Sequence, residues 1–220
     1  MHNTLINLIE IQKKIQQKIQ IKETTIKLPK IIAVTKTHPM AEILPLIKFG
    51  HLDYGENKVQ EAIEKWTEIK DKNPNIKLHL IGKLQTNKTK FAVKIFDYIH
   101  SLDNDKLASK IADEQIKQNK RLKIFIQINI GNEDQKSGVK KEDALQFYKY
   151  CKNLNLDVIG TMCIPPKESN TQYYFSEMSK INELLNLQEL SMGMSEDYLD
   201  AALNNSTFIR IGSKIFGQRD

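Results

Sequence analysis

The sequence is poor in the residues that stabilise small secreted proteins or build fibrous ones. Of its 220 residues only two are cysteines, Cys151 and Cys163, with no CxxC pair and no histidine spacing typical of zinc. We therefore expect two buried, reduced thiols, and neither a disulfide framework nor a metal site. With 9 Gly, 6 Pro and a hydrophobic content of 40%, the composition is that of a globular chain, and the length allows one sizeable core.

The sequence also lacks long apolar runs. No stretch approaches the roughly 20 uninterrupted apolar residues that a membrane-spanning helix needs. The first residues mix Asn, Glu, Gln and Lys, where a signal peptide would be apolar. The sequence therefore predicts a cytoplasmic protein with no membrane association.

The charge is unbalanced but not clustered. The formal net charge is +6, yet the lysines are spread along the whole chain and interleaved with Glu and Asp. This pattern is typical of solvated helix faces, so no specific nucleic-acid partner is expected. Weak, salt-sensitive binding of nucleic acid through the excess positive charge is kept as a minor alternative.

Short apolar runs alternate with longer amphipathic segments along the chain. Apolar residues at helical spacing predict an opening helix over 3–22. Eight strands are expected, at 31–35, 52–54, 78–81, 98–101, 123–129, 157–162, 189–192 and 208–211. Crossover helices are expected between most of them, at 57–70, 87–96, 105–119, 141–153 and 169–187.

Eight alternations of this kind predict a single (β/α)8 TIM barrel domain over residues 1–220, with an extra N-terminal helix. The alternative, a doubly wound open sheet, usually has fewer strands and a glycine-rich first turn. Neither GxGxxG nor GxxxxGK[ST] occurs in the chain. A nucleotide-phosphate loop of either kind is therefore not expected.

Lys36 follows the first buried strand directly. Ligand sites of parallel barrels gather at the carboxyl ends of the strands, where a lysine amine can form a Schiff base with a carbonyl cofactor. A lysine that leaves the strand and extends to water is the commoner situation, so this signal is weak by itself. Further residues must support it.

Small and polar residues follow the other strands, and the last strand supplies the second signal. Gly212 and Ser213 come after 208–211 and precede a short helical turn, an arrangement that can hold a phosphate. Ser195 can add a hydroxyl, with helix N-capping as the alternative, and Arg210 is expected at the barrel mouth, with an ion pair inside the barrel as its alternative. Barrel closure makes the first and last strands neighbours, so a lysine facing a phosphate site suggests pyridoxal 5'-phosphate.

Six segments together resemble one known family. They are IIAVTK (31–36), YGENKVQEA (54–62), LHLIGKLQTNK (78–88), IQINIGNEDQKSG (126–138), LSMGMSEDYLDA (190–201) and STFIRIGSKIFGQRD (206–220). The pattern is similar to that of the YggS/PROSC family of pyridoxal phosphate homeostasis proteins and covers nearly the whole chain. The resemblance implies a fold like the N-terminal barrel of bacterial alanine racemase.

The resemblance assigns roles residue by residue. Lys36 matches the lysine that holds the cofactor as an internal aldimine, and Asn57 matches a pocket residue near the ring. Arg210 matches the arginine that faces the pyridine nitrogen. The positions that hold the phosphate correspond to Gly212, Ser213 and Ser195. Lys136, in the KSG motif, matches a basic residue of the cofactor pocket, with an exposed loop lysine as the alternative.

The family resemblance implies a cofactor carrier rather than an enzyme. An arginine beside the ring nitrogen disfavours its protonation and weakens the ring as an electron sink. The tyrosine that serves alanine racemases as a second base depends on a C-terminal domain that this sequence does not show. We therefore expect no catalytic residues, and a monomer that holds pyridoxal phosphate and delivers it to apo-enzymes. The alternative is a small fold-type III amino-acid racemase with Lys36 as its single base.

Overall fold

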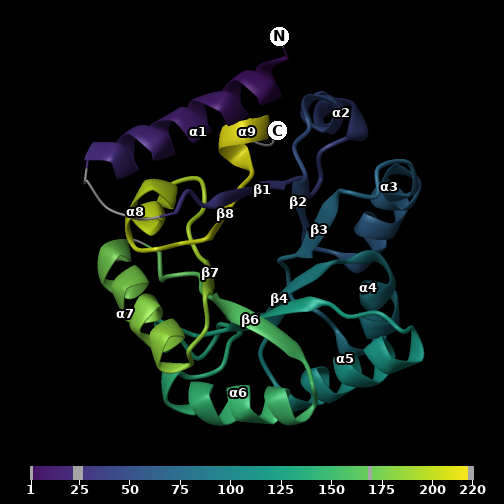
Figure 1. The fold of residues 1–220 in the computed structure, drawn as a ribbon, viewed down its shortest axis with the longest axis vertical. Coiled ribbons are helices and arrows are strands. Elements are labelled where there is room, and N and C mark those ends of the chain that lie inside the picture. The colour runs from purple at the N-terminus through teal and green to yellow at the C-terminus, as the bar shows by residue number, and fades with distance from the viewer. Residues whose placement is uncertain (1, 22–26, 168–169, 218–220) are drawn as a thin grey trace.

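The predicted barrel is confirmed. A computed structural model describes residues 2–21, 27–167 and 170–217 (Figure 1). Eight parallel strands form a closed barrel in chain order. They are β1 (Lys30–Val34), β2 (Asp53–Glu56), β3 (Lys77–Leu80), β4 (Tyr98–Leu102), β5 (Lys123–Gln127), β6 (Asp157–Met162), β7 (Glu189–Ser191) and β8 (Phe208–Ile211).

Helices surround the barrel on the outside (Figure 1). They are α1 (Asn3–Ile21), α2 (Met40–Phe49), α3 (Val59–Lys72), α4 (Thr89–Ile95), α5 (Asp105–Lys117), α6 (Ala144–Asn153), α7 (Thr171–Leu184), α8 (Tyr198–Leu203) and α9 (Ser213–Phe216), with 3-10 turns η1 (Thr86–Lys88) and η2 (Lys141–Asp143). Residues 22 and 169, the ends of two predicted helices, lie outside the described residues. Among the described residues, no helix has the length and apolar character needed to cross a membrane.

Helix α1 is the predicted extra element. It buries Leu8, Ile11, Ile15 and Ile19, whose spacing of three and four residues places them on one face of a helix. Figure 1 shows α1 lying beside α9. The Asn7 side chain of α1 donates a hydrogen bond of 2.9 Å to the carbonyl oxygen of Ile215 in α9. The N-terminal helix is therefore packed directly against the turn that follows β8.

Two helices were not predicted from the sequence. Helix α2 contains Pro45, which sits in the interior of a helix where a proline is unfavourable, and it ends at Gly50 with a left-handed φ of 94°. Helix α8 is only six residues long and buries Ala201 and Ala202, whose small side chains give a weak periodic signal. Both helices depend on packing against the barrel more than on their own sequence.

Alternation along the strands decides which side chains fill the barrel. In β1 Ile32 belongs to the inner cluster with Tyr98 and Phe208, whereas Ile31 and Ala33 belong to the outer core beneath the helices. Because side chains of a strand point to opposite faces in turn, Lys36 continues the inward series that begins at Ile32. The first strand therefore carries its lysine on the inner side of the barrel.

The barrel interior also holds polar side chains. His79 on β3 and His100 on β4 are both fully buried. Burial lowers the pKa of His79 and places the pKa of His100 well below its usual value, because a charged imidazolium loses its hydration there. Both rings are therefore neutral at physiological pH.

These two histidines make the fold sensitive to mild acid. An unfolded chain takes up protons on both rings near pH 6.5, while the folded chain does not, so stability should be constant above about pH 6.5 and fall below it. The expected slope is at most ~1.4 kcal/mol per pH unit for each histidine. Urea unfolding at a series of pH values from about 7.5 to 5 measures it. His2 is exposed, so the control variant His2→Gln should show the same dependence of stability on pH. A free energy of unfolding that stays constant or rises on acidification would contradict this prediction.

Candidate functional site

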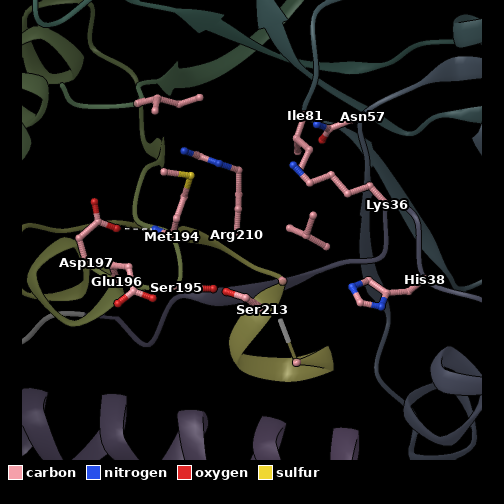
Figure 2. A pocket seen from close by; sticks show the side chains of 14 residues that line it. Lys36, His38, Asn57, Ile81, Met194, Ser195, Glu196, Asp197, Arg210 and Ser213 are labelled. Atoms are coloured by element: carbon pink, nitrogen blue, oxygen red, sulfur yellow. Dashed lines mark hydrogen bonds between the residues drawn. The ribbon is translucent and has the colours of Figure 1, made fainter. Parts of the chain in front are cut away.

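A cavity of about 620 Å³ opens at the carboxyl ends of the strands (Figure 2). Six of the seven residues predicted from the sequence line it: Lys36, Asn57, Ser195, Arg210, Gly212 and Ser213. They come from four different segments of the chain, at the ends of β1, β2, β7 and β8. The fold thus brings these residues to one place, while their roles toward a cofactor stay predictions.

Lys36 enters the cavity from the first strand. Figure 2 shows its side chain extending from the end of β1 into the space beside Arg210. The following residue, Thr37, has a φ of 67°, a left-handed conformation that is strained for a β-branched side chain. The turn lies between two residues that both line the cavity, Lys36 and His38.

A group of polar side chains, buried at Glu56 and half-buried at Lys65 and Glu61, holds the backbone on both sides of Lys36. Lys65 Nζ donates to the Thr35 carbonyl oxygen at 2.8 Å, to Glu56 Oε1 at 3.0 Å and to Glu61 Oε1 at 2.9 Å. Glu61 Oε1 also accepts from the Thr37 backbone N–H at 2.5 Å. Partial burial acts to raise the pKa of Glu61, but the hydrogen bonds from Thr37 and Lys65 hold it below its usual value. One lysine of α3 therefore fixes the residues before and after Lys36.

Glu56 is the innermost member of that group. Its side chain is fully buried, and Oε1 accepts hydrogen bonds from Thr35 Oγ1 at 2.7 Å and from Trp66 Nε1 at 2.9 Å, in addition to the bond from Lys65. Sequence reasoning missed this arrangement. The available signals were the helical spacing of residues 61 and 65 and the glutamate of the GEN motif, which by themselves do not indicate that Lys65 turns inward.

Asn57 is positioned by the neighbouring strand end. A Cβ added at Gly82, just after β3, would lie 2.4 Å from the Asn57 backbone oxygen, so only glycine allows the two segments to approach this closely. Ser101 Oγ donates to the Gly82 carbonyl oxygen at 2.7 Å and fixes that segment from β4. The small residues predicted at the strand ends therefore act here as spacers between loops.

The turn after β8 forms the opposite wall of the cavity. Ser213 begins α9, and Figure 2 shows it next to Ser195. Ser195 Oγ accepts a hydrogen bond of 3.4 Å from the backbone N–H of Lys214 in the first turn of α9. Two hydroxyl groups therefore meet at the start of one helical turn.

Ser195 does not cap the helix that follows it. Helix α8 begins at Tyr198, and the residue at its N-cap is Asp197. Asp197 Oδ1 instead accepts from the Met194 backbone N–H at 2.6 Å and closes the loop after β7. The N-cap alternative for Ser195 is thus replaced by a contact with the turn after β8.

Arg210 lies at the floor of the cavity and is only 4% exposed. Its Nη1 donates to Ser191 Oγ at 2.6 Å and its Nη2 donates to the Cys163 carbonyl oxygen at 2.9 Å. Among the described residues no carboxylate forms a salt bridge with it, so the predicted alternative of an ion pair inside the barrel is not what the structure shows.

Burial lowers the pKa of Arg210 from its usual value and raises the pKa of the Cys163 thiol to about 12. The arginine remains a cation, because guanidinium is so weak an acid, and the thiol remains neutral.

Lys136 is the one predicted residue that the structure does not bring into the cavity. Its Nζ forms an ion pair of 2.5 Å with Glu133 Oε2 and donates to the Pro165 carbonyl oxygen at 3.3 Å. The loop that carries it is closed by Asn129, whose Oδ1 accepts from the Glu133 N–H at 3.1 Å. These contacts agree with the loop-lysine alternative.

Several lining residues gave no signal in the sequence. Ile81, Ile164 and Met194 supply apolar walls, and nothing in their sequence context distinguishes them from other core residues. His38 also lines the cavity, with its ring stacked on Phe216 at a centroid distance of 4.7 Å.

The cavity therefore combines apolar walls with two cationic side chains and a hydroxyl-bearing turn. Two acidic residues also line it, but Glu196 is exposed to solvent and Asp197 accepts a hydrogen bond from the Met194 backbone. The cationic groups and the turn suit a small anionic ligand that carries an electrophilic carbonyl group.

Comparison with known sequences gives consistent matches over most of the chain. The family described as alanine racemase, N-terminal domain, matches residues 7–220. The pyridoxal phosphate homeostasis protein of Pasteurella multocida is 36% identical over 225 residues, which cover 97% of this chain and 97% of that protein.

Two solved structures extend the comparison. PipY of Synechococcus elongatus, solved with pyridoxal phosphate bound, is 32% identical with a TM-score of 0.80, covering 92% of this chain and 100% of PipY. The alanine racemase of Clostridium difficile has a TM-score of 0.71 at 14% identity, covering 99% of this chain and 57% of the racemase. The second likeness shows a shared fold only.

The lysine of α3 gives a direct test of how the site is held. Lys65→Met keeps the apolar stem but leaves the buried Glu56 without its cationic partner, so the free energy of unfolding should fall by about 3 kcal/mol. Urea denaturation measures the change. Lys180→Met, which removes the exposed ion pair with Glu177, is the matched control and should change stability little. Equal changes in the free energy of unfolding for the two substitutions would show that the Lys65 contacts stabilise the fold no more than an exposed ion pair does.

Proposed function

Because the chain belongs to the family of pyridoxal phosphate homeostasis proteins, we propose that it binds pyridoxal 5'-phosphate in the cavity at the ends of β1 and β8 and keeps it available to other proteins. The observation that carries this proposal is the convergence of Lys36, Arg210 and the Gly212 turn on one cavity. The PipY structure with pyridoxal phosphate bound supports the choice of ligand. The proposal includes a single-domain monomer that acts in the cytoplasm.

Lys36 is the proposed anchor. Its primary amine and the aldehyde of the bound ligand would join reversibly as a Schiff base, with loss of one water molecule. Lys36 is half-buried and lines the cavity, so its amine lies where the aldehyde of a bound ligand would be. The partly buried contacts of Lys65 keep the backbone around Lys36 in place.

The remaining residues are proposed to orient the ligand. Ser213, Ser195 and the backbone at Gly212 would hold the phosphate at the turn after β8, where hydroxyl groups and a helix start meet. Arg210 would face the ring nitrogen, and Asn57 would contact the ring from the β2 side. Lys136 is left outside this arrangement because its contacts lie with Glu133 and Pro165.

A carrier suits this site better than an enzyme does. The Arg210 cation disfavours protonation of the ring nitrogen and so weakens the electron withdrawal on which carbanion chemistry depends. Among the described residues that line the cavity there is no tyrosine to act as a second base opposite Lys36. The relatives are named as homeostasis proteins rather than as racemases.

The anchor is tested by absorbance. Wild-type protein mixed with pyridoxal phosphate and freed of excess ligand should show the visible band of a lysine Schiff base, and borohydride should abolish the band. Lys36→Ala should lack the band, while Lys58→Ala, an exposed lysine next to Asn57, should keep it. A band that survives in Lys36→Ala would place the anchor elsewhere. Sustained interconversion of D- and L-amino acids, lost in Lys36→Ala, would favour the racemase alternative.

Delivery is tested with an apo-enzyme. Loaded wild-type protein added to an apo-aminotransferase should restore its activity, because transfer needs only exchange of the Lys36 amine for that of the acceptor or for water. The measurement is the rate of reactivation, compared with that given by the same amount of free pyridoxal phosphate. Protein whose Schiff base has been reduced with borohydride is the matched control and should restore none. If the unreduced protein also restores none, the protein sequesters the cofactor but does not deliver it.

A further inference from the structure

A continuous chain of hydrogen bonds crosses the interior of the barrel and ends at Arg210. Asp53 Oδ1 lies 3.0 Å from His79 Nε2, and His79 Nδ1 lies 3.0 Å from His100 Nε2. His100 Nδ1 lies 2.8 Å from Ser191 Oγ, which accepts from Arg210 Nη1 at 2.6 Å. The chain therefore runs through five strands, β2, β3, β4, β7 and β8, from the start of β2 to the floor of the cavity.

The anionic end of the chain fixes the direction of its hydrogen bonds. The ionised Asp53 carboxylate can only accept, so the neutral His79 ring carries its proton on Nε2 and donates to it. His79 Nδ1 is then an acceptor, so the neutral His100 ring carries its proton on Nε2 and donates to His79. His100 Nδ1 in turn accepts from the Ser191 hydroxyl, whose oxygen accepts from Arg210 Nη1. Both histidines thus have the same tautomer.

Aromatic rings hold this arrangement in place. His79 stacks on Tyr98 with centroids 4.2 Å apart and planes at 14°, and His100 stacks on Phe125 with centroids 4.2 Å apart and planes at 19°. Phe208 packs against both imidazoles, with ring centroids 5.7 Å from that of His79 and 6.1 Å from that of His100. The rings have little freedom to turn over, and the apolar surroundings strengthen the hydrogen bonds between them.

Charges occur mainly at the two ends of the chain. Among the described residues, the charged groups that act on His79 are Asp53, Asp97 and Lys30, whereas those that act on His100 are His79, if protonated, and Arg210. Burial acts to raise the pKa of Asp53, but the hydrogen bond from His79 lowers it overall, so the carboxylate is ionised. An anion at one end and a cation at the other both favour the direction derived above.

The Asp53 end is reached from the opposite side of the barrel. Asp53 lines a second cavity of about 420 Å³, together with Lys30 and His51 at the amino-terminal ends of the strands. Its side chain is 18% exposed, in contrast to the fully buried histidines. Solvent therefore has access to the anionic end of the chain but not to its middle.

We propose that Asp53, His79, His100 and Ser191 are positioning residues that hold the Arg210 guanidinium through a one-directional hydrogen-bond relay. The relay leaves Arg210 charged and oriented, with its remaining N–H groups available to the ligand cavity, although no carboxylate of the described residues forms a salt bridge with it. Asp53 supplies the compensating negative charge from the far end of the barrel. The effect on ligand binding rests on the proposed function, whereas the relay itself is a property of the protein without ligand.

Nuclear magnetic resonance of the unliganded, 15N-labelled full chain tests the relay directly. Long-range 1H–15N spectra should show His79 and His100 each protonated at Nε2 and unprotonated at Nδ1 at neutral pH. The Arg210 Nη hydrogens should give resolved signals, because two hydrogen bonds restrict rotation of the guanidinium. A proton on Nδ1 of either histidine, or an imidazolium in either ring, would overturn the proposal.

Ser191→Ala removes the link between His100 and Arg210 with the loss of a single oxygen. We expect the His100 Nδ1 signal to shift and the resolved Arg210 signals to broaden. The matched control is Thr161→Val, which removes another buried hydroxyl, bonded to Asn182 at 2.9 Å outside the relay. Both variants should lose some stability, but only Ser191→Ala should change the Arg210 signals. Unchanged His100 and Arg210 signals in Ser191→Ala would refute the relay.

Ligand titration then tests what the relay does for binding. The dissociation constant of pyridoxal phosphate should increase about tenfold in Ser191→Ala, because a hydrogen bond to a charged group is lost. Asp53→Asn keeps an acceptor for His79 but removes the negative charge, and a smaller increase is expected. Unaltered affinity in Ser191→Ala would overturn the positioning role. A wild-type protein that binds no pyridoxal phosphate would refute the proposed function, while the resonance spectra would still decide the relay.

Discussion

Pairing of the first strand with the last is the interaction on which the site depends. The register joins Ile31 to Ile209 and Ile32 to Arg210, so closure of the barrel fixes how far Lys36 and the Gly212 turn extend beyond the strand ends. Without this pairing, residues 36 and 212 would be separated by most of the chain. Helix α1 packs against α9 directly after β8, which stabilises the turn that closure brings to the cavity.

The two cationic residues of the cavity, Lys36 and Arg210, are positioned by groups that lie behind the cavity rather than in it. Lys65, Glu56 and Glu61 fix the backbone around Lys36 from the α3 side. Arg210 is fixed from below by Ser191 and by the Cys163 carbonyl oxygen. Because these partners contact the outer or lower side of the site, the functional groups of Lys36 and Arg210 can be oriented without a side chain that blocks the cavity. Such supporting contacts are what hold a binding geometry to a narrow range.

The interior of the barrel contains both aromatic side chains and polar histidines, and close packing by itself does not require the histidines. Phe125, Phe208 and Tyr98 fill it as expected for a barrel core, but two histidines lie stacked among them. Burial of imidazoles is unfavourable unless their nitrogens are paired, and here each ring nitrogen has a partner. The cost of burying these groups is offset only while both rings remain neutral, which links the stability of the core to pH.

The sequence by itself determined the strand alternation, and hence the barrel, because short runs with apolar residues that alternate with longer amphipathic segments are a local pattern. It also determined which residues follow the strand ends, so six residues of the cavity, Lys36 and Arg210 among them, could be named in advance. Helices α2 and α8 escaped prediction because Pro45 and a short, small-residue helix give weak local signals. Only the tertiary structure decided that Lys65 turns inward, that Lys136 pairs with Glu133 outside the cavity, and that His79 meets His100. Those contacts join residues on different elements, and their geometry follows from barrel closure and packing, which no local pattern encodes.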